Sequence, residues 1–312
     1  MQRMTLSFRG LRSVKRELVL GFAAMLSLLV VVSAAALFAH AKSLHAVDRL
    51  VNRDNRAAVL ALTVTNTLLK ARRAEKDFLI NHRGFGFAAA RARYETLFRS
   101  HIADMRGHVA EARSVADSFD FARQTREVEE AIRQYESGFV AVVALYERLG
   151  HHAHGLEGLL RSRARAAEAT IDELRSDRLM ANLLAMRRHE KDYLLRWQDT
   201  DAEKARDAVA AFQTSVREVA MTAAQRESLL AASKAYLTLF DGLVDVKNQI
   251  DVERREYLLA VHRMEPMLDT LYREAAADAV ATHANLDVEV GYAERIVLLG
   301  GLAAVLIGLG VS

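Results

Sequence analysis

The stretch LLKARRAEKDFLI, residues 68–80, occurs a second time as LLAMRRHEKDYLL, residues 183–195. The two copies are separated by a constant offset of 115 residues and share the core pattern RRxEKD. In each copy apolar residues recur three or four positions apart, the spacing that places side chains on one face of an α-helix. A repeat of this length has the size of a helical bundle and exceeds the 20–50-residue unit of a solenoid. The sequence therefore predicts two related helical modules.

An aromatic pattern also recurs downstream of each copy. Tyr135 and Phe139 in the first half correspond to Tyr236 and Phe240 in the second. Residues four positions apart share a helix face. Each half is therefore expected to combine a helix that carries the charged motif with a longer helix that carries an aromatic stripe.

The composition favours long helices joined by few turns. Among 312 residues there are one proline, 15 glycines and no cysteine, while 51% are hydrophobic and 27% are charged. Because β-rich chains need many proline and glycine turns, we predict an all-α fold. The absence of cysteine excludes thiol catalysis and cysteine-ligated zinc.

Pro266 is expected to kink a helix without ending it. Helix breaks are expected at residues 83–86, 114–121, 150–158, 198–201 and 221–222.

Two apolar segments bracket the helical region. Residues 18–39 contain no charge and, as a helix, are long enough to cross a hydrocarbon core of about 30 Å. A cleaved signal peptide, with small residues at Ala39 and Ala41, is the alternative, but its apolar region is normally about 7–15 residues long. We expect the apolar residues 296–312 to be the start of a second span, truncated at Ser312. The predicted order is a basic tail (1–17), a span (18–39), a helical region (40–295) and a second span (296–312).

The charge distribution predicts the orientation of these segments. The first 16 residues hold five basic side chains and no acidic one, so the positive-inside rule places this tail in the cytoplasm. Without these five the chain has 38 basic and 40 acidic residues, and its net charge of +3 gives no reason to expect nucleic-acid binding. Two spans in the bacterial inner membrane would then place residues 40–295 in the periplasm, where a domain without cysteine avoids oxidative cross-linking.

With the RRxEKD motif in both halves of a helical region between two spans, the chain resembles the helical bimodular sensor domain of bacterial receptors. This domain is found mostly in methyl-accepting chemotaxis proteins and sometimes in sensor histidine kinases. The resemblance covers residues 40–295. It implies two stacked four-helix-bundle modules that share long helices, a homodimer, and a small organic anion such as a dicarboxylate or acetate as ligand. It also implies signalling to cytoplasmic adaptor and kinase proteins through a part of the receptor beyond Ser312.

The cations of the repeat are the first candidate ligand site. They continue the apolar stripe of their helices, and a buried cation needs a carboxylate partner. In one interpretation, guanidinium forks from both halves grip a carboxylate ligand. In the other, the cations of each copy pair with acidic residues of the other copy and hold the modules in register. The candidates are Arg72, Arg73, Lys76, Arg187, Arg188 and Lys191.

A second candidate site lies near the start of the helical region, in the sequence NRDNR. Its two arginines are three positions apart and share a helix face, and its two asparagine amides could add donors to a carboxylate. The alternative is a solvated polar turn of helix. Arg175 and Arg178 have the same spacing and could face this pair. The candidates are Asn52, Arg53, Asn55 and Arg56.

The sequence does not indicate other chemistry. His151, His152 and His154 lie in a glycine-flanked bend, but no carboxylate completes an obvious metal site, so we expect an exposed polar loop. No nucleophile elbow, phosphate-binding glycine loop or HExxH motif occurs in residues 40–295, and we expect neither an enzyme nor a cofactor. The alternatives to a chemoreceptor are a histidine-kinase input region, a ligand-free helical stalk and a domain that docks a periplasmic binding protein.

Overall fold

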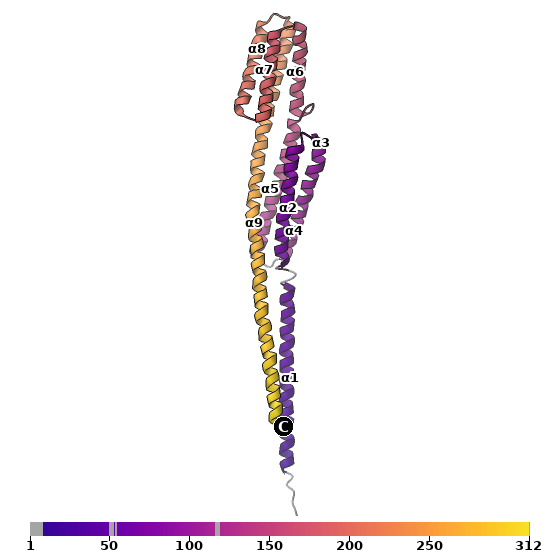
Figure 1. Ribbon diagram of the computed structural model, residues 1–312, viewed down its shortest axis with the longest axis vertical. Coiled ribbons are helices and arrows are strands. Elements are labelled where there is room, and N and C mark those ends of the chain that lie inside the picture. Colours follow the sequence, from indigo (N-terminus) through magenta and orange to yellow (C-terminus); the bar gives the residue numbers. More distant parts are fainter. Residues whose placement is uncertain (1–8, 50–52, 54, 116–118, 312) are drawn as a thin grey trace, which may run out of the picture. The chain divides into compact units, whose positions relative to one another are not determined.

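The structure, a computed structural model, describes residues 9–49, 53, 55–115 and 119–311. Within these residues every regular element is helical and no strand occurs, which confirms the predicted all-α fold (Figure 1). The elements in chain order are α1 (Arg9–Arg49), α2 (Asn55–Asn81), α3 (Phe87–Ala90), the π-helical segment η2 (Arg91–Glu95), α4 (Thr96–Val115), α5 (Phe119–Leu149), α6 (Gly155–Leu174), α7 (Asp177–Arg196), α8 (Asp199–Glu218) and α9 (Ala223–Val311).

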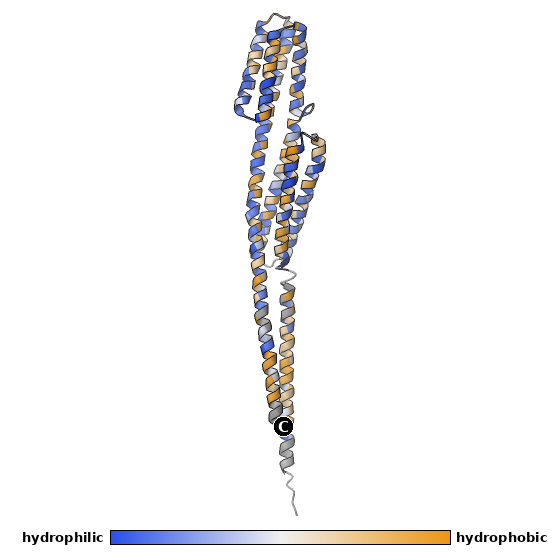
Figure 2. Ribbon diagram, in the orientation of Figure 1, coloured by the Kyte–Doolittle hydropathy of each residue, from blue (hydrophilic) through white to orange (hydrophobic). Residues whose placement is uncertain are grey.

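Helix α1 contains the first predicted span. Its segment Val19–Lys42 is long and apolar enough to cross a membrane, and its most apolar stretch is not buried inside the protein. Phe22 and Phe38 are 65% and 74% exposed, and Figure 2 shows this helix coloured mostly as hydrophobic. The second predicted segment, from residue 296, forms the end of α9. Its role as a membrane span stays a prediction.

One compact unit comprises residues 64–107 and 126–267. Part of its core is aromatic and is formed by α2, α4, α5 and α9. The buried rings are Phe78 of α2, Phe98 of α4, Phe139 of α5 and Tyr257 of α9. The ring centroids of Phe98 and Phe139 are 4.4 Å apart, and the Phe78 and Phe139 rings meet edge to face at 5.8 Å. Such pairs add to the energy of burial. Gly138 lets α5 approach α9, because a Cβ there would lie 2.7 Å from the Cβ of Tyr257.

The same unit contains the second repeat copy, on α7. Tyr193 of α7 and Phe240 of α9 are buried, with ring centroids 5.5 Å apart. Asn182 Nδ2 of α7 donates to Ser215 Oγ of α8 at 2.6 Å, which satisfies two polar groups between these helices. The predicted aromatic stripe therefore packs into the core in both halves of the sequence.

The other compact unit comprises residues 1–63, 108–125 and 268–312. Among its described residues, Gln124 Nε2 of α5 donates to the Glu274 carboxylate of α9 at 2.9 Å. Near the apolar ends of the chain, a Cβ at Gly300 of α9 would lie 2.4 Å from Val32 Cγ2 of α1. Glycine at this position therefore allows α1 and α9 to approach closely, as small residues do between membrane helices.

The predicted breaks coincide with helix ends. At the break at 114–121, residues 116–118 lie outside the described part of the chain. Before α9, Thr222 and Gln225 form a capping box in which Gln225 N donates to Thr222 Oγ1 at 3.2 Å and Thr222 N donates to Gln225 Oε1 at 3.1 Å. Pro266 lies inside α9 and does not end the helix, as expected.

One break was missed by the sequence analysis. Helix α6 ends at Leu174 and α7 begins at Asp177, with Ser176 as N-cap accepting a hydrogen bond from Leu179 N. Arg175 ends α6 in the left-handed region, at φ 51°. Glycine usually occupies such a position, because other residues are strained there. The turn therefore lacks the glycine that marks the breaks at 83–86 and 150–158.

Candidate functional site

The repeated motif places a buried glutamate in its first copy. Glu75 is 3% exposed, and three side chains donate hydrogen bonds to its carboxylate. Arg72 Nη1, one turn earlier on α2, lies 2.7 Å from Oε2. Tyr135 Oη of α5 lies 2.6 Å from the same oxygen, and Tyr257 Oη of α9 lies 2.9 Å from Oε1. One carboxylate therefore joins three helices.

Burial and the neighbouring carboxylate keep both tyrosines protonated. Burial, followed by the charge of Glu75, raises the pKa of Tyr135 and of Tyr257 well above the usual value. Partial burial acts to lower the pKa of Arg72, but its charge interactions and hydrogen bonds with Glu75 and Tyr135 together outweigh burial, and the net shift is upward. The hydroxyls and the guanidinium are thus lasting donors, and hydrogen bonds to a charged acceptor are about twice as strong as neutral ones.

The second copy repeats this arrangement around Glu190, which is fully buried. Arg187 Nη1 donates to its Oε2 at 3.0 Å, and Lys191 Nζ donates to its Oε1 at 2.7 Å. Tyr236 of α9 donates to Oε2, and burial followed by the charge of Glu190 raises the pKa of this tyrosine. Lys191 here donates to the oxygen that corresponds to the one bonded by Tyr257 in the first copy.

The predicted pairing between the two copies is wrong. The first arginine of each copy pairs with the glutamate three residues later in its own helix. The second arginines behave in the same way, with Arg73 Nε 3.9 Å from Asp77 Oδ2 and Arg188 Nε 4.0 Å from Asp192 Oδ2. Residues three or four apart are neighbours on a helix surface. These ion pairs therefore stay within each copy of the repeat and do not join the two copies.

These contacts divide the six cations of the repeat into two groups. Arg72, Arg187 and Lys191 bind buried carboxylates of the protein itself. Arg73, Lys76 and Arg188 are exposed, and the Lys191 side chain is also 47% exposed. The contacts give the first group a structural role beside the buried glutamates, and a ligand-binding role for any of the six stays a prediction.

The second predicted site contains an ion pair on the surface of the other compact unit. Arg56 Nε of α2 donates to Glu111 Oε1 of α4 at 2.8 Å. The two side chains are 56% and 36% exposed. Arg53 and Asn55 are also exposed, and Asn52 lies outside the described residues. Arg56, which the sequence predicts as a ligand-binding residue, thus already pairs with the carboxylate of Glu111.

Arg175 and Arg178, predicted to add to this second site, have structural surroundings of their own. Arg178 of α7 donates to the carboxylate of Glu218 on α8. Arg175 ends α6, and its backbone N–H donates to Asp172 O at 3.1 Å. Arg175 therefore belongs to the turn between α6 and α7, and Arg178 links the start of α7 to the end of α8.

The histidine-rich bend between α5 and α6 is tied to a buried carboxylate. Glu157 is 5% exposed, and Arg83 Nη2 donates to its Oε1 at 2.6 Å. His151 Nδ1 lies 3.7 Å from Glu157 Oε2, and burial, followed by the charges of His152 and Arg83, lowers the pKa of His151. His152 and His154 are exposed. Among the described residues no group of three potential ligands could hold a metal ion.

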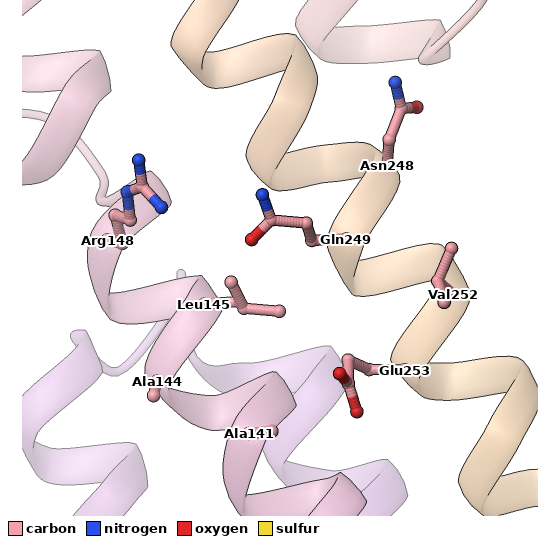
Figure 3. A pocket seen from close by; sticks show the side chains of 8 residues that line it. All are labelled: Ala141, Ala144, Leu145, Arg148, Asn248, Gln249, Val252 and Glu253. Carbon is pink, nitrogen blue, oxygen red and sulfur yellow. The ribbon is translucent and has the colours of Figure 1, made fainter.

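An open groove of about 680 Å³ lies between α5 and α9 (Figure 3). Arg148 of α5 and Glu253 of α9 bring opposite charges to its two walls, and the Gln249 side chain extends from α9 toward α5. Within the described chain, no hydrogen bond or ion pair engages any of the polar side chains of this groove. The lining residues are Ala141, Ala144, Leu145, Arg148, Asn248, Gln249, Val252 and Glu253.

A second groove, of about 370 Å³, is charged but internally neutralised. Arg91 donates to Glu95 and to Glu147, each at 2.9 Å, and Arg99 Nη2 donates to Glu95 Oε1 at 2.7 Å. Because these cations and carboxylates already pair with each other, a ligand would have to displace protein contacts there. In the groove between α5 and α9, a ligand would not have to displace such ion pairs between described residues.

Sequence reasoning missed the tyrosines that bind the two glutamates. A signal was present for two of them, since Tyr135 and Tyr236 belong to the aromatic stripe that recurs with the motif. Tyr257 has no counterpart in the second copy and no sequence pattern marks it. The groove was also missed, because its walls come from solvent-facing positions of two helices far apart in the sequence.

The chain matches no protein-family model and no curated protein. The likeness of its doubled motif to the helical bimodular sensor domain therefore rests on the motif residues alone, and membership of that family stays a prediction.

Proposed function

We propose that this chain is the sensory region of a bacterial transmembrane receptor of the chemotaxis type, which binds a small organic acid outside the inner membrane. The observation that carries the proposal is the course of α9. This helix is unbroken from Ala223 to Val311. It supplies Tyr236 to the second glutamate cluster and Tyr257 to the first, then continues into the apolar segment that starts at residue 296.

Such a helix can pass a displacement from a ligand site to the membrane. A ligand that favours one packing of α9 over another shifts the balance between the two by its difference in affinity, typically about 1–3 kcal/mol. The hydrogen-bonded clusters fix the register of α9 against α2 and α7 and so define the state from which it moves. In this proposal the signal passes on to cytoplasmic adaptor and kinase proteins.

The proposed architecture is two stacked four-helix modules that share long helices. Rings from α2, α4, α5 and α9 surround the first glutamate cluster, and contacts among α7, α8 and α9 surround the second. The proposed topology has α1 and the end of α9 as two spans and residues 40–295 in the periplasm. The close approach of Gly300 to Val32 supports two neighbouring membrane helices.

A second copy of the chain is the proposed partner. Helix α2 exposes Val59, Leu62, Leu69 and Ile80, which are 50–74% accessible to solvent. Val59, Leu62, Asn66 and Leu69 follow the alternating spacing of three and four residues of a coiled-coil seam, and the next two seam positions before Ile80 hold the exposed Arg73 and Lys76. A polar asparagine in such a seam favours one register and one oligomeric state. The stripe therefore suits the matching face of an identical helix.

A ligand panel tests the proposal. The purified chain in lipid nanodiscs is heated with acetate, malate, succinate or citrate. A ligand present at 100 times its Kd should stabilise the fold by about 2.7 kcal/mol, which raises Tm by roughly 5–10 °C. Arg56→Ala should abolish the shift if the second candidate site binds the acid, and Arg255→Ala, which changes an exposed arginine on α9, is the matched control. If none of the acids shifts Tm of the folded chain, a ligand-free stalk is the better description.

A further inference from the structure

We propose that the groove between α5 and α9 is a binding site for a small zwitterion of the amino-acid class. The site is separate from the glutamate clusters and from the arginines at the start of α2. Its binding chemistry does not depend on the proposed receptor function. Only the consequence of binding, a bias on α9, rests on that function.

The charges of the groove select for a zwitterion. Arg148 offers a planar fork of donors that can hold a carboxylate through two hydrogen bonds. Glu253 on the opposite wall can accept hydrogen bonds from an ammonium group. Neither charge is neutralised within the described residues. A dicarboxylate would bring an anion toward Glu253, and a diamine would bring a cation toward Arg148, so both are disfavoured.

The remaining lining matches the rest of an amino acid. The side-chain amides of Asn248 and Gln249 supply donors and acceptors that can orient the polar end of the ligand. The apolar part of the wall can cover an aliphatic side chain. A volume of about 680 Å³ lies within the range of pockets that hold small molecules, so the groove can admit a substantial side chain. The apolar lining residues are Ala141, Ala144, Leu145 and Val252.

The position of the groove along α9 suggests what binding would do. Asn248 and Glu253 lie on α9 between Tyr236 and Tyr257, the residues that bond the two buried glutamates. A ligand that bridges Arg148 and Glu253 would add a link between α5 and α9 between those clusters. Amino-acid binding would then bias the same helix that the proposed organic acid acts on.

The test measures binding of the twenty standard L-amino acids, each alone, to the full chain in nanodiscs by isothermal titration calorimetry. At least one should bind, while its N-acetyl derivative, which lacks the ammonium group, and its amide, which lacks the carboxylate, should bind at least tenfold more weakly. Arg148→Gln and Glu253→Gln should each lower the affinity at least tenfold. Arg255→Gln and Glu256→Gln, which neutralise exposed charges on α9 outside the groove, should leave it unchanged.

Three results would overturn the assignment: no binding of any amino acid, equal binding of the N-acetyl derivative, or binding that survives both substitutions in the groove. The exchanged variant Arg148→Glu with Glu253→Arg should bind better than either single neutralised variant, because it restores one charge of each sign. A double variant that binds no better contradicts the proposed charge pairing. Titrations with malate and acetate on the same variants separate this site from the proposed organic-acid site, since their affinity should not respond to changes in the groove.

Discussion

Replacing Tyr135 by phenylalanine tests whether the buried glutamate clusters hold the helices together. The substitution removes one hydroxyl and keeps the ring, which packs against Phe98 with centroids 5.1 Å apart. The lost contact is the 2.6 Å hydrogen bond to Glu75, whose carboxylate is 3% exposed. Hydrogen bonds to charged groups contribute about 1.5–3 kcal/mol. Because Arg72 and Tyr257 still donate to the carboxylate, the cost should fall in that range and not approach that of an unpaired buried charge.

The assay is urea unfolding of the purified chain in detergent micelles, followed by circular dichroism. The free energy of unfolding falls by about 1–3 kcal/mol for each molar increase in urea, so the urea concentration at the unfolding midpoint should fall by roughly 1 M. The matched control is Tyr272→Phe on α9, where the side chain is 42% exposed and the change should cost less than about 0.5 kcal/mol. Tyr236→Phe in the second copy should resemble Tyr135→Phe. If Tyr135→Phe costs no more than the control, the hydroxyl does not stabilise a buried carboxylate and the reasoning is refuted.

Three further substitutions probe other parts of the structure. Burial, followed by the charges of neighbouring Arg83 and His151, lowers the pKa of His82, so the folded chain favours the neutral imidazole. Folding stability is therefore lost as pH falls below about 6.5, the pKa of histidine in the unfolded chain. His82→Phe should therefore show a smaller drop in Tm between about pH 7.5 and about pH 5 than the unaltered chain, and an equal drop would contradict this. Arg56→Ala removes an exposed ion pair and should change the free energy of unfolding by less than about 1 kcal/mol; a larger loss would show that the pair is not merely superficial. Arg175→Gly relieves a left-handed backbone and should stabilise the chain by up to about 1 kcal/mol in urea unfolding, and destabilisation would mean that the arginine side chain contributes more than the strain costs.

The helical fold and most of its turns were readable from the sequence. Glycine marks the breaks after Asn81 and Leu149, and the Thr222–Gln225 capping box marks the start of α9. The break at Arg175 was not readable, because a left-handed arginine leaves no trace in residue type.

The charged motif shows what pattern reasoning can and cannot decide. The expectation that buried cations need carboxylates was sound, but it left open which carboxylate each cation would meet. Arg72 reaches Glu75 within one helix, and the helix rotation that buries Glu75 also brings Tyr135 and Tyr257 to it. Those rotations depend on three-dimensional packing, which spacing along a single helix does not determine. The groove at Arg148 is invisible to sequence patterns for the same reason.

In the proposed mechanism, ligand binding shifts α9 relative to α1 at the membrane. Because the chain has no cysteine, single cysteines at Leu299 and Val31 can carry spin labels without background. Dipolar broadening in continuous-wave electron paramagnetic resonance spectra, which suits the short separation of these closely packed helices, then measures the distance between the labels in nanodiscs, with and without the acid that raises Tm most. We expect the distance to change by about 1–2 Å, the scale of helix shifts in receptors and allosteric proteins. An unchanged distance at saturating ligand would contradict transmission through α9.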